Sequence, residues 1–73
     1  MISKGWRFKV LESNCLTFKH GDIVKPVKIS NGRWLIGFDY RRSLYFDRKD
    51  SVTYEVYSAI TPEKLLVRIE RIK

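Results

Sequence analysis

The chain has 73 residues, of which 44% are hydrophobic and 14% aromatic. This size allows one domain, residues 1–73, and excludes a second. The apolar content predicts a folded globule rather than a disordered chain. Fifteen Lys and Arg against eight Asp and Glu give a net charge of +7. Such a basic domain favours polyanionic partners, because contacts with phosphates release condensed counterions.

Cysteine usage and hydropathy indicate where the protein acts. Cys15 is the single cysteine, so an internal disulfide is impossible, and a reducing compartment is favoured. No apolar run has the length of a membrane span or of a signal-peptide core. We therefore expect a cytoplasmic protein that does not bind membranes.

The first predicted strand covers residues 5–11. Trp6, Phe8 and Val10 alternate there with charged residues, which is typical of a half-buried strand. A connection over residues 15–20 follows, in which Leu16 and Phe18 are expected to reach the core.

A hairpin centred on Asn31-Gly32 is the strongest local signal. Asn-Gly between two apolar-rich runs is typical of a type I′ turn, whose central residues both need positive φ. A two-residue loop predicts the pairs Ile29–Trp34, Val27–Ile36, Lys25–Phe38 and Ile23–Tyr40 on one face, and Lys28–Leu35, Pro26–Gly37 and Val24–Asp39 on the other. Pro26 lacks an amide donor, so we expect its strand to lie at an edge or to carry a bulge.

Two further turns complete a predicted four-stranded meander with one hydrophobic side. Loops at residues 41–43 and 48–50 place apolar residues opposite one another along the following strands. The tail is compatible with two structures. Thr61-Pro62-Glu63 is typical of a helix start, whereas residues 65–72 suit either a helix or a strand. We expect one helical turn at 61–64 followed by a strand.

The run from Leu16 to Asp22, LTFKHGD, resembles a motif of SH3-type barrels. There an L-x-F-x-x-G-D stretch leads from a long first loop into the second strand, and a tryptophan follows the next hairpin loop, as Trp34 does here. The resemblance covers residues 16–40. It implies a mainly β fold, a small SH3-like antiparallel barrel of five to six strands, with the short helical turn before the C-terminal segment. The ALYDY segment, the doubled tryptophan and the G-x-F-P-x-N-Y segment of the proline-peptide groove have no counterpart, so that activity is not implied.

The chain contains few residues suited to catalysis. His20 has no second histidine as a ligand partner, and Cys15 has no base beyond His20 nearby in the sequence. No metal-ligand spacing, phosphate-binding glycine loop or evident carboxylate pair is present. We therefore expect no enzyme, no cofactor, no metal and no small-molecule substrate.

Basic residues interleaved with aromatic ones are the candidate binding residues. Cations at hairpin turns could contact phosphates, while exposed tyrosine rings could stack on bases. The candidates are Lys28, Arg33, Arg41, Arg42, Tyr45, Arg48, Lys49 and Tyr57.

Two functions fit this pattern. The first is nucleic-acid binding, to DNA or RNA, with little base specificity. The second is a protein-interaction module, an inhibitor or adaptor such as a viral or bacterial accessory protein, that binds an acidic surface of a partner; tyrosine and arginine are common at the centres of such interfaces. Charged hairpin tips are also ordinary solvated surface, so the sequence leaves both open.

Overall fold

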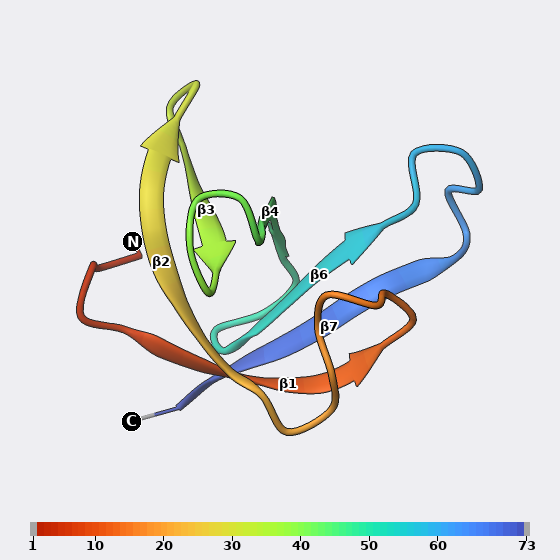
Figure 1. Ribbon diagram of the computed structural model, residues 1–73, viewed down its shortest axis with the longest axis horizontal. Coiled ribbons are helices and arrows are strands. Elements are labelled where there is room, and N and C mark those ends of the chain that lie inside the picture. The colour runs from red at the N-terminus through yellow and green to blue at the C-terminus, as the bar shows by residue number, and fades with distance from the viewer. Residues whose placement is uncertain (1, 73) are drawn as a thin grey trace.

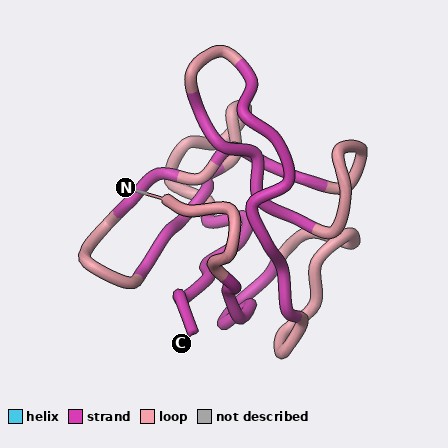
Figure 2. Tube along the Cα trace, turned by 90° about the vertical axis from the view of Figure 1, so that its left-hand side faces the viewer, coloured by secondary structure: helices cyan, strands magenta, loops and turns pink. Residues whose placement is uncertain are grey.

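Strands are the sole regular elements of the computed structural model, which describes residues 2–72 (Figure 2). They are β1 (Arg7–Ser13), β2 (Ile23–Ser30), β3 (Arg33–Gly37), β4 (Ser43–Tyr45), β5 (Asp47–Arg48), β6 (Thr53–Tyr57) and β7 (Leu65–Ile72). Within this range no helix could serve as a membrane span.

The seven strands form one antiparallel sheet in the order β4-β3-β2-β1-β7-β6-β5. The two edge strands, β4 and β5, are separated in the chain by Phe46 alone. The sheet must therefore curl until its edges meet, which gives a small, nearly closed barrel (Figure 1). This arrangement is consistent with the SH3-like fold that residues 16–40 resemble.

Two finer predictions of the fold are not confirmed. The structure has seven strands rather than five to six, because the chain turns a corner at buried Phe46 and divides one predicted strand into β4 and β5. Residues 61–64 form a turn, closed by the Lys64 N–H donating to the Thr61 carbonyl at 2.8 Å, and not a helical turn. The strand expected after them is present as β7.

The Asn31-Gly32 turn has the predicted geometry, with φ of 55° and 75°. Beside it Ile29 pairs with Trp34 and Lys28 with Leu35, as predicted. The register then shifts by one residue between Pro26 and Lys28. This bulge is the one that proline made probable, and it makes every predicted pair beyond it wrong. Pro26 lies opposite Ile36, and Lys25 opposite Gly37.

The bulge also reverses which side chains of β2 face the core. Val24 and Pro26 are buried, whereas Ile23, predicted on the hydrophobic face, is 49% exposed. Ile29 and Tyr40 from the same predicted face are exposed as well, because one lies in the protruding end of the hairpin and the other in a loop (Figure 1).

Both predicted three-residue loops are wrong. β3 ends at Gly37, and residues 38–42 connect it to β4. A Cβ at position 37 would overlap the Arg42 carbonyl and the backbone of Ser43, so glycine allows this connection to fold back closely. The β5–β6 turn is closed by the Lys49 N–H donating to the Thr53 carbonyl at 2.8 Å.

The core lies inside the barrel and combines residues from five strands with two phenylalanines from connecting positions. It consists of Phe8, Val10, Phe18, Val24, Ile36, Phe46, Tyr54, Val67 and Ile69. Phe18 is buried as predicted. Leu16, expected beside it, is 99% exposed in the connection between β1 and β2.

The positive φ at Gly32 gives a direct test of the hairpin. A Cβ there would meet no atom within 4 Å, so the cost of Gly32→Val comes from backbone conformation alone. We expect a loss of about 1–3 kcal/mol in the free energy of unfolding. Thermal melting should fall by roughly 4–8 °C for each kcal/mol lost.

Gly5→Val is the matched control. Position 5 is also open, and its φ lies outside the left-handed region. An equal fall in melting temperature for both variants would contradict a specific requirement for positive φ at Gly32.

Candidate functional site

Two cations lie side by side on the outer face of β1 and β2. Phe8 pairs with Val24, and both side chains are buried. Because side chains alternate along a strand, Arg7 and Lys25 point to the outside, next to one another across the strand pair. Both are exposed.

A third cation joins this face through the bulge in β2. Lys25 lies opposite Gly37 and Lys28 opposite Leu35, two positions that share one side of β3. Lys25 and Lys28 therefore both face outward, although they are three positions apart in the sequence. The Lys28 Nζ lies 4.7 Å from the centroid of the Tyr40 ring, and Tyr40 is 59% exposed.

Arg7, Lys25 and Tyr40 border a groove made of two adjoining cavities of about 340 and 250 Å³. Arg7, Lys25 and Phe38 line both cavities. Lys4 lines the larger one, because the N-terminal segment runs beside β2 (Figure 1). We call this the basic groove. Its complete lining is Lys4, Arg7, Ile23, Val24, Lys25, Pro26, Val27, Gly37, Phe38, Asp39 and Tyr40.

The basic groove has a positive charge that is not neutralised internally. Within residues 2–72, Lys4, Arg7 and Lys25 form no ion pair. Asp39 is the one acid in the lining, and its Oδ2 accepts hydrogen bonds from Arg42 Nε and Nη2 at 3.0 and 2.9 Å. These hydrogen bonds hold the pKa of Asp39 below its ordinary value. Asp39 and Arg42 therefore cancel one another.

Half of the sequence-predicted cations have acidic partners among the described residues. Arg33 Nη2 lies 3.0 Å from Asp47, Arg42 is bound to Asp39, and Lys49 Nζ lies 3.9 Å from Glu55. In the described part of the chain, Arg41, Arg48 and Lys28 form no ion pair. The predicted set thus does not come together as one surface.

The two predicted stacking tyrosines each have a cation over the ring. Arg33 Cζ lies 5.2 Å from the Tyr45 ring centroid, and Lys49 Nζ lies 5.5 Å from that of Tyr57. The Tyr57 hydroxyl also donates to Glu55 at 2.9 Å. Tyr40, which was not among the predicted binding residues, is the most exposed tyrosine.

A separate cavity, outside the basic groove, lies at the barrel end near the N-terminus and has a volume of about 230 Å³. We call it the aromatic pocket. Three of its six lining residues are aromatic and two are arginines. They are Ile2, Arg33, Trp34, Phe46, Arg48 and Tyr54. Arg33 and Arg48 are among the predicted binding residues, and the structure brings them to this pocket.

Sequence reasoning missed Lys4, Arg7, Lys25 and Tyr40. Alternation already placed Arg7 outside, opposite the core side chains of its strand. Lys25 was assigned to the hydrophobic face because the hairpin register was extended through Pro26. The proline itself was the available signal, since a bulge there moves Lys25 to the outer face.

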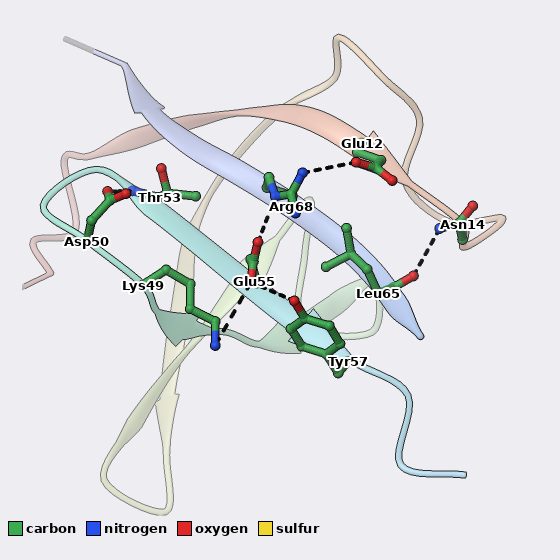
Figure 3. A network of polar contacts seen from close by, with 9 residues as sticks. All are labelled: Glu12, Asn14, Lys49, Asp50, Thr53, Glu55, Tyr57, Leu65 and Arg68. Carbon is green, nitrogen blue, oxygen red and sulfur yellow. Dashed lines mark hydrogen bonds and ion pairs between the residues drawn. The ribbon is translucent and has the colours of Figure 1, made fainter. Parts of the chain in front are cut away.

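An acidic residue organises the opposite side of the barrel. The buried carboxylate of Glu55 accepts hydrogen bonds from Arg68 Nε at 2.7 Å and from the Tyr57 hydroxyl, with Lys49 nearby (Figure 3). Arg68 Nη1 also donates to Glu12 at 3.0 Å, which ties β1, β6 and β7 together. The hydrogen bond from Arg68 outweighs burial and lowers the pKa of Glu55.

The residues considered for catalysis remain apart from this chemistry. His20 is exposed, and Cys15 is half-buried against the core. Residues 2–72 contain no group of three or more His, Cys, Asp or Glu placed to hold a metal ion.

Comparison with protein-family models, curated proteins and solved structures gives no match. The basic groove and the aromatic pocket are therefore the features from which a function can be inferred.

The lowered pKa of Glu55 has a pH-dependent consequence. Its folded-state pKa lies below the ordinary value of 4.5, so the carboxylate contributes stability above that pH. This contribution is lost as the pH falls through the folded-state pKa. We expect Glu55→Gln to lower the free energy of unfolding by about 1.5–3 kcal/mol at neutral pH. Urea denaturation should show a smaller difference from wild type in acid.

Glu63→Gln is the control, because Glu63 is exposed and forms no ion pair in the described range. It should leave the urea midpoint nearly unchanged at both pH values. If Glu55→Gln behaves like Glu63→Gln, the network contributes nothing to stability.

Proposed function

We propose that this chain is a small, non-enzymatic nucleic-acid-binding protein of the cytoplasm, in which the basic groove holds the phosphate backbone of DNA or RNA. The observation that carries the proposal is the clustering of Lys4, Arg7 and Lys25 in one groove, where none of them has an acidic partner among residues 2–72. Phosphates would supply the missing negative charge.

Without a bound anion, the cations of the basic groove lower the stability of the protein. Arg7 and Lys25 are neighbours across β1 and β2, and like charges at such positions repel. Other cations of the barrel have acidic partners. Arg33, Arg42 and Arg68 each lie beside a carboxylate. Violations of local design rules concentrate at functional sites. A polyanion is the ligand class that turns this repulsion into attraction.

Residues around the basic groove extend the same chemistry. Lys28 lies beside Tyr40. Arg41, which follows Tyr40 in the loop, is exposed and forms no ion pair among residues 2–72. The exposed Tyr40 ring offers a surface for a base or a sugar. Of the originally predicted set, Lys28 and Arg41 therefore keep a direct role, whereas Arg42 and Lys49 contribute less because their charges are already paired.

The test is a double charge reversal in the basic groove, Lys4→Glu with Lys25→Glu. Affinity for a labelled oligonucleotide, measured by fluorescence anisotropy at several salt concentrations, should fall. The slope of log K against log salt should flatten by up to ~2 units if both lysines contact phosphate. Lys19→Glu with Lys64→Glu is the matched control, with the same change of charge on exposed lysines outside the groove.

Two results would contradict the proposal. If the wild type binds neither single-stranded nor double-stranded oligonucleotides at low salt, nucleic-acid binding is wrong. If the control pair weakens binding as much as the groove pair, net charge rather than the basic groove is responsible.

One observation favours the protein-interaction alternative. Leu16 and Ile60 are 99% and 94% exposed in two loops, which is unusual for large apolar side chains and suits a protein contact. In that case a pull-down from nuclease-treated lysate should retain a protein partner, and Leu16→Ser with Ile60→Ser should lose it. Loss of every partner after nuclease treatment would instead favour nucleic acid.

A further inference from the structure

We infer that the aromatic pocket receives one unpaired base of the nucleic acid whose backbone lies in the basic groove, so that the protein prefers single strands to duplexes. This inference rests on the proposed function and adds to it the class of nucleic acid and the residue that reads it. Trp34 is the stacking residue in this arrangement.

The two tryptophans differ in whether a ring face is available. Arg71 Cζ lies 3.5 Å from the Trp6 ring centroid, and Trp6 also packs against Phe8. Trp34 is half-buried, lines the aromatic pocket, and within residues 2–72 has neither a cation nor an aromatic ring stacked on it. A partly exposed indole in the lining of a pocket is a suitable stacking surface for a base.

Charge at the pocket matches a nucleotide rather than a neutral ring. Arg48 lines it, and its Nε donates to the Asp50 carbonyl at 3.0 Å. Its Nη1 and Nη2 form no hydrogen bond with residues 2–72, so they are available to a phosphate next to the stacked base. Arg33, on the same lining, shares its charge with Asp47.

The size of the pocket limits its occupant. Its volume of about 230 Å³ is smaller than the roughly 300–1,000 Å³ of sites that enclose drug-sized ligands. Phe46 and Tyr54 are almost fully buried and form its floor. There is room for one planar ring system beside Trp34.

The pocket and the basic groove are close enough for one strand to use both. Ile2 lines the pocket and Lys4 lines the groove. The Cα atoms of these two residues are at most about 7 Å apart, because two residues of chain span no more than that. A strand lying in the groove can therefore place an adjacent base at Trp34.

A duplex cannot place a base in the aromatic pocket without an additional cost in free energy. Its bases are paired and stacked, and one must be flipped out before it can reach the pocket. The phosphates of a duplex remain available to the basic groove. The pocket should therefore add affinity for single strands alone.

The experiment compares a fluorescein-labelled DNA strand of about 12 nucleotides, the RNA of the same sequence and the DNA duplex, a length within the roughly 4–16 nucleotides that one small barrel covers. Wild type should bind both single strands more tightly than the duplex. Trp34→Ala should weaken single-strand binding about tenfold, the size expected for one stacked base, and leave duplex binding unchanged. Trp34→Phe, which keeps a ring, should retain most of the preference. A difference between DNA and RNA would show whether the 2′-hydroxyl is read.

A measurement on the wild type makes the result independent of how well Trp34→Ala folds. In ¹H–¹⁵N spectra the Trp34 indole signal, assigned from its absence in Trp34→Phe, should shift on addition of the single strand and not of the duplex. Equal affinity of wild type for single strand and duplex, or an unmoved indole signal, would overturn the pocket inference while leaving backbone binding in the basic groove intact. Failure to bind any of the three probes would overturn both.

Discussion

The bulge in β2 is the constraint on which the arrangement of this surface depends. Without it, Lys25 and Lys28 would point to opposite sides of the sheet, because they are three positions apart and side chains alternate along a strand. The extra residue between Pro26 and Lys28 changes the alternation, so that Val24 and Pro26 enter the core while both lysines face outward. Proline favours this solution, since its missing amide makes a regular ladder bond impossible. Through its effect on the backbone, Pro26 therefore determines the side of the sheet on which the two lysine charges lie.

Charge is then divided unevenly around the barrel. On the side of β6 and β7, Glu55 joins Arg68, Tyr57 and Lys49 in one network. On the side of β1 and β2, Lys4, Arg7 and Lys25 form no ion pair with any residue from 2 to 72. In a domain of this size, where net stability is only about 3–5 kcal/mol, repulsion on one face is tolerable because the other face is well bonded. The Glu55 network stabilises the barrel, and the proposed ligand is bound on the other side.

The sequence predicted the outline of this structure better than its details. Asn31-Gly32 fixed the hairpin turn and its first pairs because positive φ at both positions has few alternatives. Alternation identified β1 and placed Arg7 outside. The bulge, however, could be named as a possibility but not placed, and one misplaced residue changed the face of Lys25. The ion-pair partners of the charged residues could not be predicted from the sequence either. Pairs such as Arg33–Asp47 depend on loop geometry that the sequence pattern alone does not set.

One hairpin connects both candidate recognition elements. The outward side of β2 carries Lys25 and Lys28, and β3 carries Trp34 at the mouth of the barrel, where it pairs with Ile29. Phosphate attraction acts over about 8 Å in physiological salt and is sequence-independent. Stacking acts on contact and needs an unpaired base. In the proposed binding mode, a hairpin that carries both elements converts a general attraction into a preference for single strands. This preference requires no base-specific hydrogen bond, so a barrel as small as this one is sufficient for it.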